Sequence, residues 1–370
     1  MLGLYQASIN QRRLTVGPDS LGWGILGASQ IAERRMIEAI RFQPAAPSAL
    51  GSTGSWVVGV YSHNERRAEQ FAKANQIPHV CVNLDDLLSR REIQCVYVGS
   101  HPRHHFPLTM AALAAGKHVL CETPLALTLE EAQLMQQAAA NRGLLLGVNH
   151  VHRADPAIGE MRRFIATGAI GDVLGARISN AVLLRPQLQT WRLQANGGGV
   201  IFDRTIHSLD LLRFLLADEI AEVTAISGPA TLGERMDSEN TKPVEEDVQT
   251  AVRLTRQPVL CQVHDSFTIP HYPTSVEVYG ATGALVAYGV LTEESPRELH
   301  LWRSGQFTIV PSAAIDPYWL ALYHFNAAVR NAAPLLATAE DGVTSLAVAL
   351  AVRQSIQMQT PVRCKSLYIP

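Results

Sequence analysis

The chain has 370 residues, of which 47% are apolar and 17% charged, so it can fill substantial cores, and its length predicts about two domains. The 31 Lys and Arg residues nearly balance the 33 Asp and Glu residues. This balance argues against nucleic acid or an anionic membrane as a partner. The five cysteines are not near-neighbours, which disfavours a disulfide framework and a cysteine-based zinc site. With no apolar run long enough for a bilayer and no signal-peptide pattern, we expect a cytoplasmic protein.

Residues 21–148 are predicted to form a dinucleotide-binding domain, after an N-terminal extension at 1–20. Short apolar runs alternate there with stretches whose apolar residues recur every three or four positions. Strands that are apolar on both faces and separated by helices indicate a doubly wound α/β domain with a parallel sheet, and residues 43–55 are predicted to be a surface loop. The predicted strands are 22–26, 56–61, 95–98, 118–121 and 144–148, and the predicted helices are 65–75, 85–89, 107–115 and 129–142.

Residues 149–370 are predicted to form a substrate-binding α+β domain. Several strand-like runs follow one another with few helices between them, which favours an open, largely antiparallel sheet with one covered face. The uncovered face offers a surface through which the chain can form a homo-oligomer, and the last helices can pack back on the first domain. The predicted strands are 173–183, 222–227, 248–254, 259–267 and 274–279, and the predicted helices are 156–167, 206–216, 317–330 and 340–357.

The first predicted strand leads into a turn of small residues and then into a helix. A dinucleotide-binding turn needs a tight bend, here at Gly27, and small residues where the backbone approaches the pyrophosphate and where the helix packs on the strand. Ser29 and Ala32 occupy these two positions. Such a turn can also be purely structural, but its place after the first strand of a βα series favours dinucleotide binding.

The second predicted strand ends at Ser62, with Arg66 and Arg67 about one turn later. Enzymes specific for NAD carry an acidic side chain at this strand end, where it binds the ribose hydroxyl. A hydroxyl and a guanidinium suit a 2′-phosphate instead, because arginine offers paired donors to phosphate oxygens. The two arginines can equally be a solvated helix face. On balance the residues favour NADP(H) over NAD(H).

Two further stretches make the interpretation more specific. Residues 115–128 contain Glu122-Thr123-Pro124, and residues 197–215 contain Asp203 and His207 after three glycines. Together with the Gly27 turn they resemble the Gfo/Idh/MocA family of NAD(P)-dependent oxidoreductases, over residues 21 to 363. Within that family, residues 147–153, 188–193 and 263–268 are similar to the bacterial 1,5-anhydro-D-fructose reductases, in which NADPH reduces a ring ketone. The resemblance therefore implies a small sugar or cyclic polyol as the substrate.

The resemblance also implies roles for individual residues. His207 and Asp203 would handle the proton, with Thr123 beside them. On the cofactor side it implies Gly27, Ser29, Ile31, Ser62, Arg67, Ser100, His105, Glu122 and Asn149. On the substrate side it implies Trp191, Arg192 and His150.

Thr123 departs from the family pattern, which has lysine between the glutamate and the proline. That lysine lies by the nicotinamide ribose and the reacting carbonyl, and a threonine hydroxyl carries no positive charge and is far less acidic. A positioned acid or base contributes about 10²–10⁴-fold in rate, so its loss is costly. Asp203 and His207, spaced i, i+4 at or near a helix start, can retain the chemistry with His207 as the acid.

Two alternatives remain beside the reductase. Loss of the lysine is compatible with a non-catalytic regulator of the same fold that binds the cofactor or a sugar. A redox-assisted lyase or glycosidase, which oxidises and restores NAD within one turnover, is disfavoured by Ser62 and Arg67. The histidine-rich stretches at 101–105 and 150–152 have no carboxylate or cysteine at ligand spacing, so no metal is expected.

Overall fold

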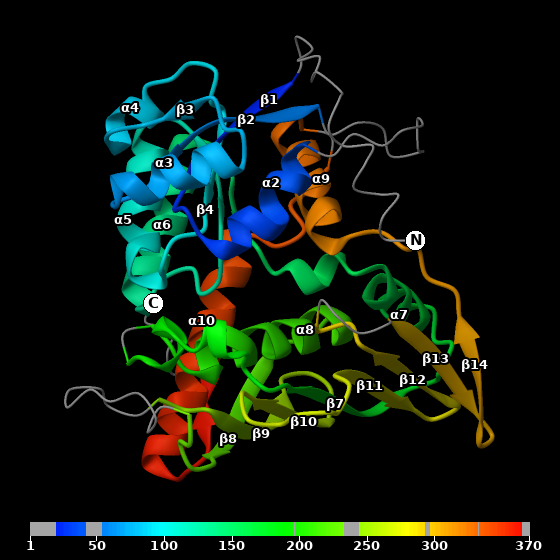
Figure 1. The fold of residues 1–370 in the computed structure, drawn as a ribbon. Helices are drawn as coiled ribbons and strands as arrows, with labels where there is room; N and C mark the ends of the chain where they lie inside the picture. The colour runs from blue at the N-terminus through cyan, green and yellow to red at the C-terminus, as the bar shows by residue number, and fades with distance from the viewer. Residues whose placement is uncertain are drawn as a thin grey trace.

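Two β-sheets, with helices between and beside them, organise the chain (Figure 1). The computed structural model describes residues 20–41, 54–195, 197–232, 244–292, 297–331 and 333–364. The expected N-terminal extension and nearly all of the expected loop at 43–55 lie outside these residues. Within the described ranges, no helix has both the length and the apolar character needed to cross a membrane.

The first sheet has six parallel strands in the order β3-β2-β1-β4-β5-β6, which confirms the doubly wound Rossmann prediction. The order reverses between β1 and β4, and such a reversal leaves a crevice at the carboxyl ends of the strands. The short strand β3 was not predicted, because two residues carry no periodicity. The strands are β1 (Leu21–Leu26), β2 (Ser55–Tyr61), β3 (His79–Val80), β4 (Cys95–Val98), β5 (His118–Cys121) and β6 (Leu146–Val148).

Helices connect these strands, and side-chain caps fix where several of them begin. Asn64, Asn83 and Thr128 each accept a hydrogen bond from the backbone N–H three residues later. Such caps satisfy backbone donors that the first helical turn leaves free. The helices of this half are η2 (Ala32–Met36), α2 (Ile37–Arg41), α3 (Glu65–Ala74), α4 (Leu84–Leu88), η3 (Pro102–His104), α5 (His105–Ala114) and α6 (Leu129–Arg142).

The second sheet has nine strands in the order β14-β13-β12-β11-β7-β10-β9-β8-β15, and every pairing except that of β7 with β10 is antiparallel. This confirms the largely antiparallel sheet, although the strands from β12 onwards were not predicted. The strands are β7 (Val173–Ala181), β8 (Ile220–Ser227), β9 (Asp247–Leu254), β10 (Leu260–Ser266), β11 (Ser275–Gly280), β12 (Gly283–Tyr288), β13 (Glu298–Arg303), β14 (Gln306–Val310) and β15 (Val362–Arg363).

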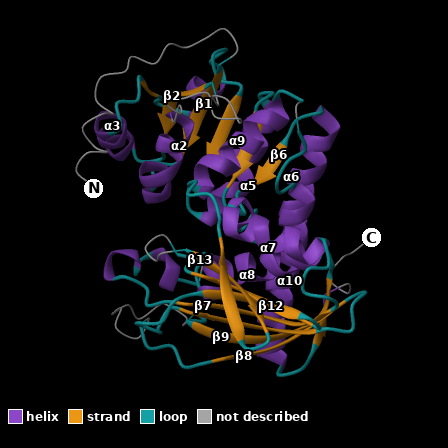
Figure 2. Ribbon diagram, turned by 90° about the vertical axis from the view of Figure 1, so that its right-hand side faces the viewer, coloured by secondary structure: helices purple, strands orange, loops and turns teal. Residues whose placement is uncertain are grey.

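Helices cover one face of this second sheet and leave the other face open (Figure 2). The burial pattern of β9 shows the two faces, because its residues alternate between buried and exposed along the strand. The helices of this half are η4 (Val151–Ala154), α7 (Pro156–Ala166), η5 (Pro186–Leu188), η6 (Trp191–Leu193), η7 (Ile201–Thr205), α8 (Ile206–Leu216), α9 (Pro317–Val329) and α10 (Ala339–Met358). Because η7 runs directly into α8, Asp203 lies within the helix and not before it.

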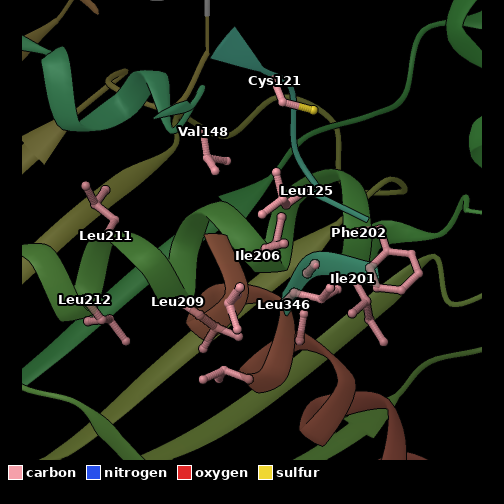
Figure 3. Close-up of a cluster of buried hydrophobic side chains, with 14 of the residues drawn as sticks. Cys121, Leu125, Val148, Ile201, Phe202, Ile206, Leu209, Leu211, Leu212 and Leu346 are labelled. Carbon is pink, nitrogen blue, oxygen red and sulfur yellow. The ribbon is translucent and has the colours of Figure 1, made fainter. Parts of the chain in front are cut away.

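The last two helices return to the first sheet. Trp319 and Phe325 of α9 belong to the same buried cluster as Trp23 of β1, and the rings of Trp23 and Phe325 are 5.4 Å apart. A second, larger cluster joins both halves: Cys121 and Val148 at the ends of β5 and β6 lie in it with apolar residues of α8 and α10 (Figure 3). The carboxyl ends of β5 and β6 are therefore held against the second half by packing.

Candidate functional site

The turn after β1 provides a close backbone approach at the point where the strand order reverses. Gly27 has φ +110°, and a Cβ there would lie 2.8 Å from Cα of Ser100, which follows β4. Only glycine fits such a position without strain. The Ser29 Oγ accepts from the Ala32 N–H at 3.3 Å, and Ile31 precedes η2 as its N-cap residue. A narrow glycine turn leading into a helix is the cradle that a dinucleotide pyrophosphate requires.

Three neighbouring strand ends meet at Glu122. Tyr97 Oη and Asn149 Nδ2 each donate to Glu122 Oε1 at 2.6 Å. Burial raises the pKa of the Glu122 carboxyl, and these two donors act in the opposite direction. The pair of hydrogen bonds fixes the segment that leads to Thr123. The sequence reasoning did not identify Tyr97; a polar hydroxyl inside the fully buried strand β4 was the available signal.

His105 links the two loops that border the turn. Its Nδ1 lies 2.8 Å from the Pro124 carbonyl oxygen, and its Nε2 lies 3.0 Å from the Ser100 carbonyl oxygen. The side chain is buried, and that burial lowers the pKa of the imidazole. With its ring nitrogens facing these two carbonyl oxygens, His105 fixes the positions of Ser100 and Pro124 relative to each other.

Thr123 and His207 meet across the two halves of the chain. The distance between Thr123 Oγ1 and His207 Nε2 is 2.8 Å. Burial lowers the pKa of His207 to about 4, with the neighbouring His150 as the next contribution. The ring is therefore neutral at neutral pH and has a single N–H. Its Nδ1 atom is buried without a hydrogen-bond partner among the described residues.

Two further histidines surround His207. The ring of His150 lies 5.5 Å from that of His207 and the ring of His152 lies 5.3 Å from it, both edge-to-face. Burial lowers the pKa of His150 to about 4 and that of His152 to about 3. His150, which is predicted from the sequence to lie on the substrate side, therefore also contacts His207. His152 was considered only as a metal ligand, although its spacing from His150 was a signal.

A buried ionic cluster lies behind these rings. His150 Nδ1 is 3.5 Å from Asp210 Oδ2, and Arg153 donates to both Asp210 carboxylate oxygens at 2.8 and 2.7 Å. Arg153 also donates to Asp341 of α10 at 2.8 Å. His150 and the arginines hold the pKa of Asp210 well below its usual range. The cluster fixes η4, α8 and α10 relative to one another beneath the histidines.

Asp203 binds Arg192, the arginine that is expected from the sequence on the substrate side. Arg192 Nε donates to Asp203 Oδ1 at 2.8 Å, and the Arg192 guanidinium lies 4.6 Å from the centre of the Trp191 ring. The expected direct support of His207 by Asp203 is not present among the described hydrogen bonds; Thr123 takes that place. A Cβ at Gly198 would lie 2.4 Å from the Trp191 carbonyl oxygen, so the glycine allows this loop to fold closely.

The end of β2 carries the residues expected to distinguish the two cofactors. Ser62 is half-buried, and the side chains of Arg66 and Arg67 are exposed in the first turn of α3. The backbone N–H of Arg67 donates to the Asn64 side chain. The Arg67 guanidinium takes no part in this helix cap. In the parts of the chain that the structure describes, no three His, Cys, Asp or Glu residues come together in a metal-binding arrangement.

Family models match most of the chain. Residues 21–150 match the model of an oxidoreductase family with an NAD-binding Rossmann fold, GFO_IDH_MocA. Residues 158–286 match the GFO/IDH/MocA C-terminal domain. The two matched segments contain every residue predicted for the site.

Individual proteins that are similar to this chain are consistent with the family match. The chain is 39% identical over 332 residues to a 1,5-anhydro-D-fructose reductase from Ensifer adhaerens, covering 89% of this chain and 94% of that protein. Its fold is similar to an aldose-aldose oxidoreductase from Caulobacter crescentus complexed with glycerol (TM-score 0.80, 20% identity, 93% and 99% of the two chains). The same TM-score, identity and coverage relate it to a levoglucosan dehydrogenase solved with NADH and levoglucosan.

Proposed function

The chain belongs to the Gfo/Idh/MocA family of oxidoreductases, and on this basis we propose that it uses NADPH to reduce a ketone in a sugar or cyclic-polyol ring, as a 1,5-anhydro-D-fructose reductase does. One observation carries the proposal. The loop after β5 places Thr123 2.8 Å from His207 of the second half, next to the nucleotide turn, so a hydroxyl and an imidazole share one proton position there.

The described residues fit a nicotinamide dinucleotide. The Gly27 turn, which a Cβ would close against Ser100, receives the pyrophosphate, and Glu122 and Asn149 border the nicotinamide side. Ser62 and Arg67 at the end of β2 bind the 2′-phosphate. When bound, the cofactor supplies a hydride to the carbonyl carbon of the substrate.

The proton for the carbonyl oxygen comes from Thr123 and His207. In the tautomer with hydrogen on Nε2, His207 donates to Thr123 Oγ1, which leaves the threonine hydroxyl proton free to donate to the substrate oxygen. As negative charge develops on that oxygen, Thr123 gives up its proton and receives the one from His207 Nε2. In the same step His207 Nδ1, which has no hydrogen-bond partner among the described residues, takes up a proton that comes from solvent, so the ring stays neutral and ends with its hydrogen on Nδ1. Exchange with solvent restores the Nε2 tautomer before the next turnover. Because His207 is neutral, the relay needs no ammonium group.

Trp191 and Arg192 form the substrate side of the site. The indole offers an apolar face to the ring of a polyol, and the guanidinium offers several donors to its hydroxyls. Asp203 holds Arg192 in place through the 2.8 Å ion pair, so its contribution to the reaction is to orient the substrate.

The test is a titration of the purified full chain with NADPH and NADH, followed by turnover of 1,5-anhydro-D-fructose. We expect tighter binding of NADPH and a rate that falls by about 10²–10⁴-fold in His207→Ala. His324→Ala, a substitution of a half-buried histidine on α9, is the matched control and retains the rate. Equal rates for the His207→Ala variant and the wild type would refute the role of His207.

A second candidate rests on Thr123 itself. A site without the lysine ammonium suits a regulator that binds cofactor or sugar without turnover. In that case both cofactors or a sugar bind, the wild type shows no turnover, and Thr123→Lys gains activity. Wild-type turnover that is preserved in Thr123→Ser excludes this candidate.

We also propose that the chain self-associates through the open face of the second sheet. Phe307 and Ile309 of β14 are 46% and 60% exposed there, and the Phe307 ring stacks on His300 with 4.2 Å between ring centres. Light scattering on the wild type and on Ile309→Lys tests this. A monomeric wild type at micromolar concentration would refute it.

A further inference from the structure

Two histidines whose rings contact each other follow strands β2 and β4 and have no part in the proton relay. His63 directly follows Ser62 at the end of β2, and His104 ends η3 in the loop after β4. Their ring centres are 4.7 Å apart, at an angle of 57°. The pair bridges the two loops between which the adenosine end of a dinucleotide lies in a doubly wound sheet.

Each ring is held by one neighbour and keeps one nitrogen for another partner. Tyr61 Oη lies 3.3 Å from His63 Nδ1, and Arg103 Nε donates to His104 Nε2 at 3.0 Å. Because Arg103 takes the Nε2 acceptor of His104, a neutral His104 carries its hydrogen on Nδ1. His63 Nε2 and His104 Nδ1 are thus the two ring positions outside these contacts.

The surroundings of the pair are strongly cationic. Burial, His63 and Arg103 all lower the pKa of His104. A positive charge on the His104 ring is therefore unfavourable while no anion is present. The titratable and charged residues in contact with the pair are Tyr61, His101 and Arg103, and the buried His105 lies next to His104. Glu65, Arg66 and Arg67 follow His63 in the chain, in the first turn of α3. Of these only Glu65 is acidic.

We propose that His63 and His104 form a proton-linked receptor for the 2′-phosphate of NADP(H), so that the preference for NADPH over NADH strengthens as the pH falls toward neutrality. The inference rests on the proposed NADP(H) use of the same site. A phosphate monoester is close to a dianion above pH 7, because its second pKa is about 6. Set beside Ser62 and Arg67, it offsets the repulsion between the His104 ring and Arg103. As it binds, His104 Nε2 takes up a proton from solvent and releases the Arg103 Nε–H that it accepts in the free protein.

The direction of the effect follows from this uptake. The complex holds more protons than the free protein and free cofactor, so NADPH binds more tightly as pH falls from about 8 to 7. The dissociation constant changes by up to about tenfold per pH unit for each proton taken up. NADH lacks the 2′-phosphate, and its affinity stays level over the same range.

Isothermal titration calorimetry on the full chain tests this without any turnover. NADPH and NADH are titrated at pH 7.0, 7.5 and 8.0 in phosphate-free buffers of different ionisation enthalpy, which counts the protons taken up. We expect roughly one more proton for NADPH than for NADH. We expect His63→Gln/His104→Gln to lose this difference, and His79→Gln, a substitution on β3, to keep it.

The outcomes of the calorimetry distinguish the proposed preference for NADPH from the proposed role of the histidine pair. Equal affinity for NADPH and NADH at every pH would refute the cofactor preference itself. A preference for NADPH with no difference in proton uptake, or with the same uptake in the double variant, would refute the role of the histidine pair and leave the preference standing. Arg67→Met weakens NADPH binding at all three pH values while the difference in uptake persists.

Discussion

Thr123 Oγ1 and His207 Nε2 lie 2.8 Å apart, although the two residues are 84 positions apart in the chain and belong to different halves of the fold. The hydroxyl lies where the resemblance to the family implies a lysine, and its partner in the structure is an imidazole. A relay through a hydroxyl and a ring nitrogen transfers a proton without a permanent positive charge.

The relay predicts opposite results for two small substitutions of Thr123. Thr123→Val keeps the shape and removes the hydroxyl, so kcat should fall by about 10²–10⁴-fold. Thr123→Ser keeps the hydroxyl and should retain the rate within about tenfold. Steady-state kinetics with NADPH and the ring ketone measures both, with thermal unfolding as the control for folding. A fully active Thr123→Val would exclude the relay.

The buried histidines predict that stability falls as the pH is lowered from 7.5 to 6. The pKa values of His150, His152 and His207 are lowered to about 4, 3 and 4, so these rings stay neutral in the native state. In the unfolded chain these rings ionise near pH 6.5. As the pH falls, the unfolded state therefore binds more protons than the native state, and the free energy of unfolding decreases. Each ring contributes at most about 1.4 kcal/mol per pH unit.

Urea unfolding at several pH values between 6 and 7.5 checks this slope. Asp265 acts in the opposite direction at the lower end of this window and below it, because burial raises its pKa to about 6 in the native state. The double variant His150→Gln/His152→Gln should show a shallower dependence than the wild type. An unchanged slope would mean that these two rings are charged in the native protein.

The buried ion cluster predicts a large loss of stability in Arg153→Met. The substitution removes both hydrogen bonds to Asp210 and the one to Asp341, and leaves Asp210 as a buried carboxylate beside Arg213 and Ser345. Breaking one partner of such a pair costs about 3–5 kcal/mol. Arg163→Met, which breaks an exposed pair with Glu160, should cost less than about 1 kcal/mol. Comparable losses for the two variants, measured by chemical denaturation, would contradict this account.

The substitution Gly27→Ala is predicted to weaken cofactor binding selectively. Alanine there meets the backbone of Ser100 at 2.8 Å, so the turn has to open, and the affinity for either dinucleotide should fall by at least tenfold in fluorescence titrations. Gly143→Ala is the matched control: it also has positive φ, at +63°, but a Cβ there meets nothing within 4 Å. It should cost about 1 kcal/mol of stability and leave binding intact. Equal binding by the two variants would remove Gly27 from the site.

Much of the fold was predictable, because the long elements carry clear periodicity. The strands of the first sheet have buried residues on both faces, and β9 alternates strictly. The π-helical start at Ile201–Thr205 was not predictable, since it depends on tertiary contacts and not on local preference. Nor was β14, whose residues are mostly exposed and have no alternating pattern of burial.

The sequence names the residues of the candidate site, but it does not show which of them contact one another. The motif around Asp203 and His207 identified both residues, but their partners, Arg192 and Thr123, come from other segments. Such partners depend on how two sheets are placed against each other, which spacing along the chain does not encode. Tyr97 was missed although its hydroxyl lies in a fully buried strand, because spacing along the chain does not show its contact with Glu122.

The place of α9 in the core around Trp23 has a consequence for synthesis on the ribosome. The β-strands of the first sheet are complete at Val148, but the helix that covers Trp23 ends at Val329, roughly 180 residues later. At a synthesis rate of about 5–20 residues per second, that apolar surface stays uncovered by α9 for on the order of 10–40 s. The nascent nucleotide-binding half therefore exposes this apolar surface until translation is nearly finished.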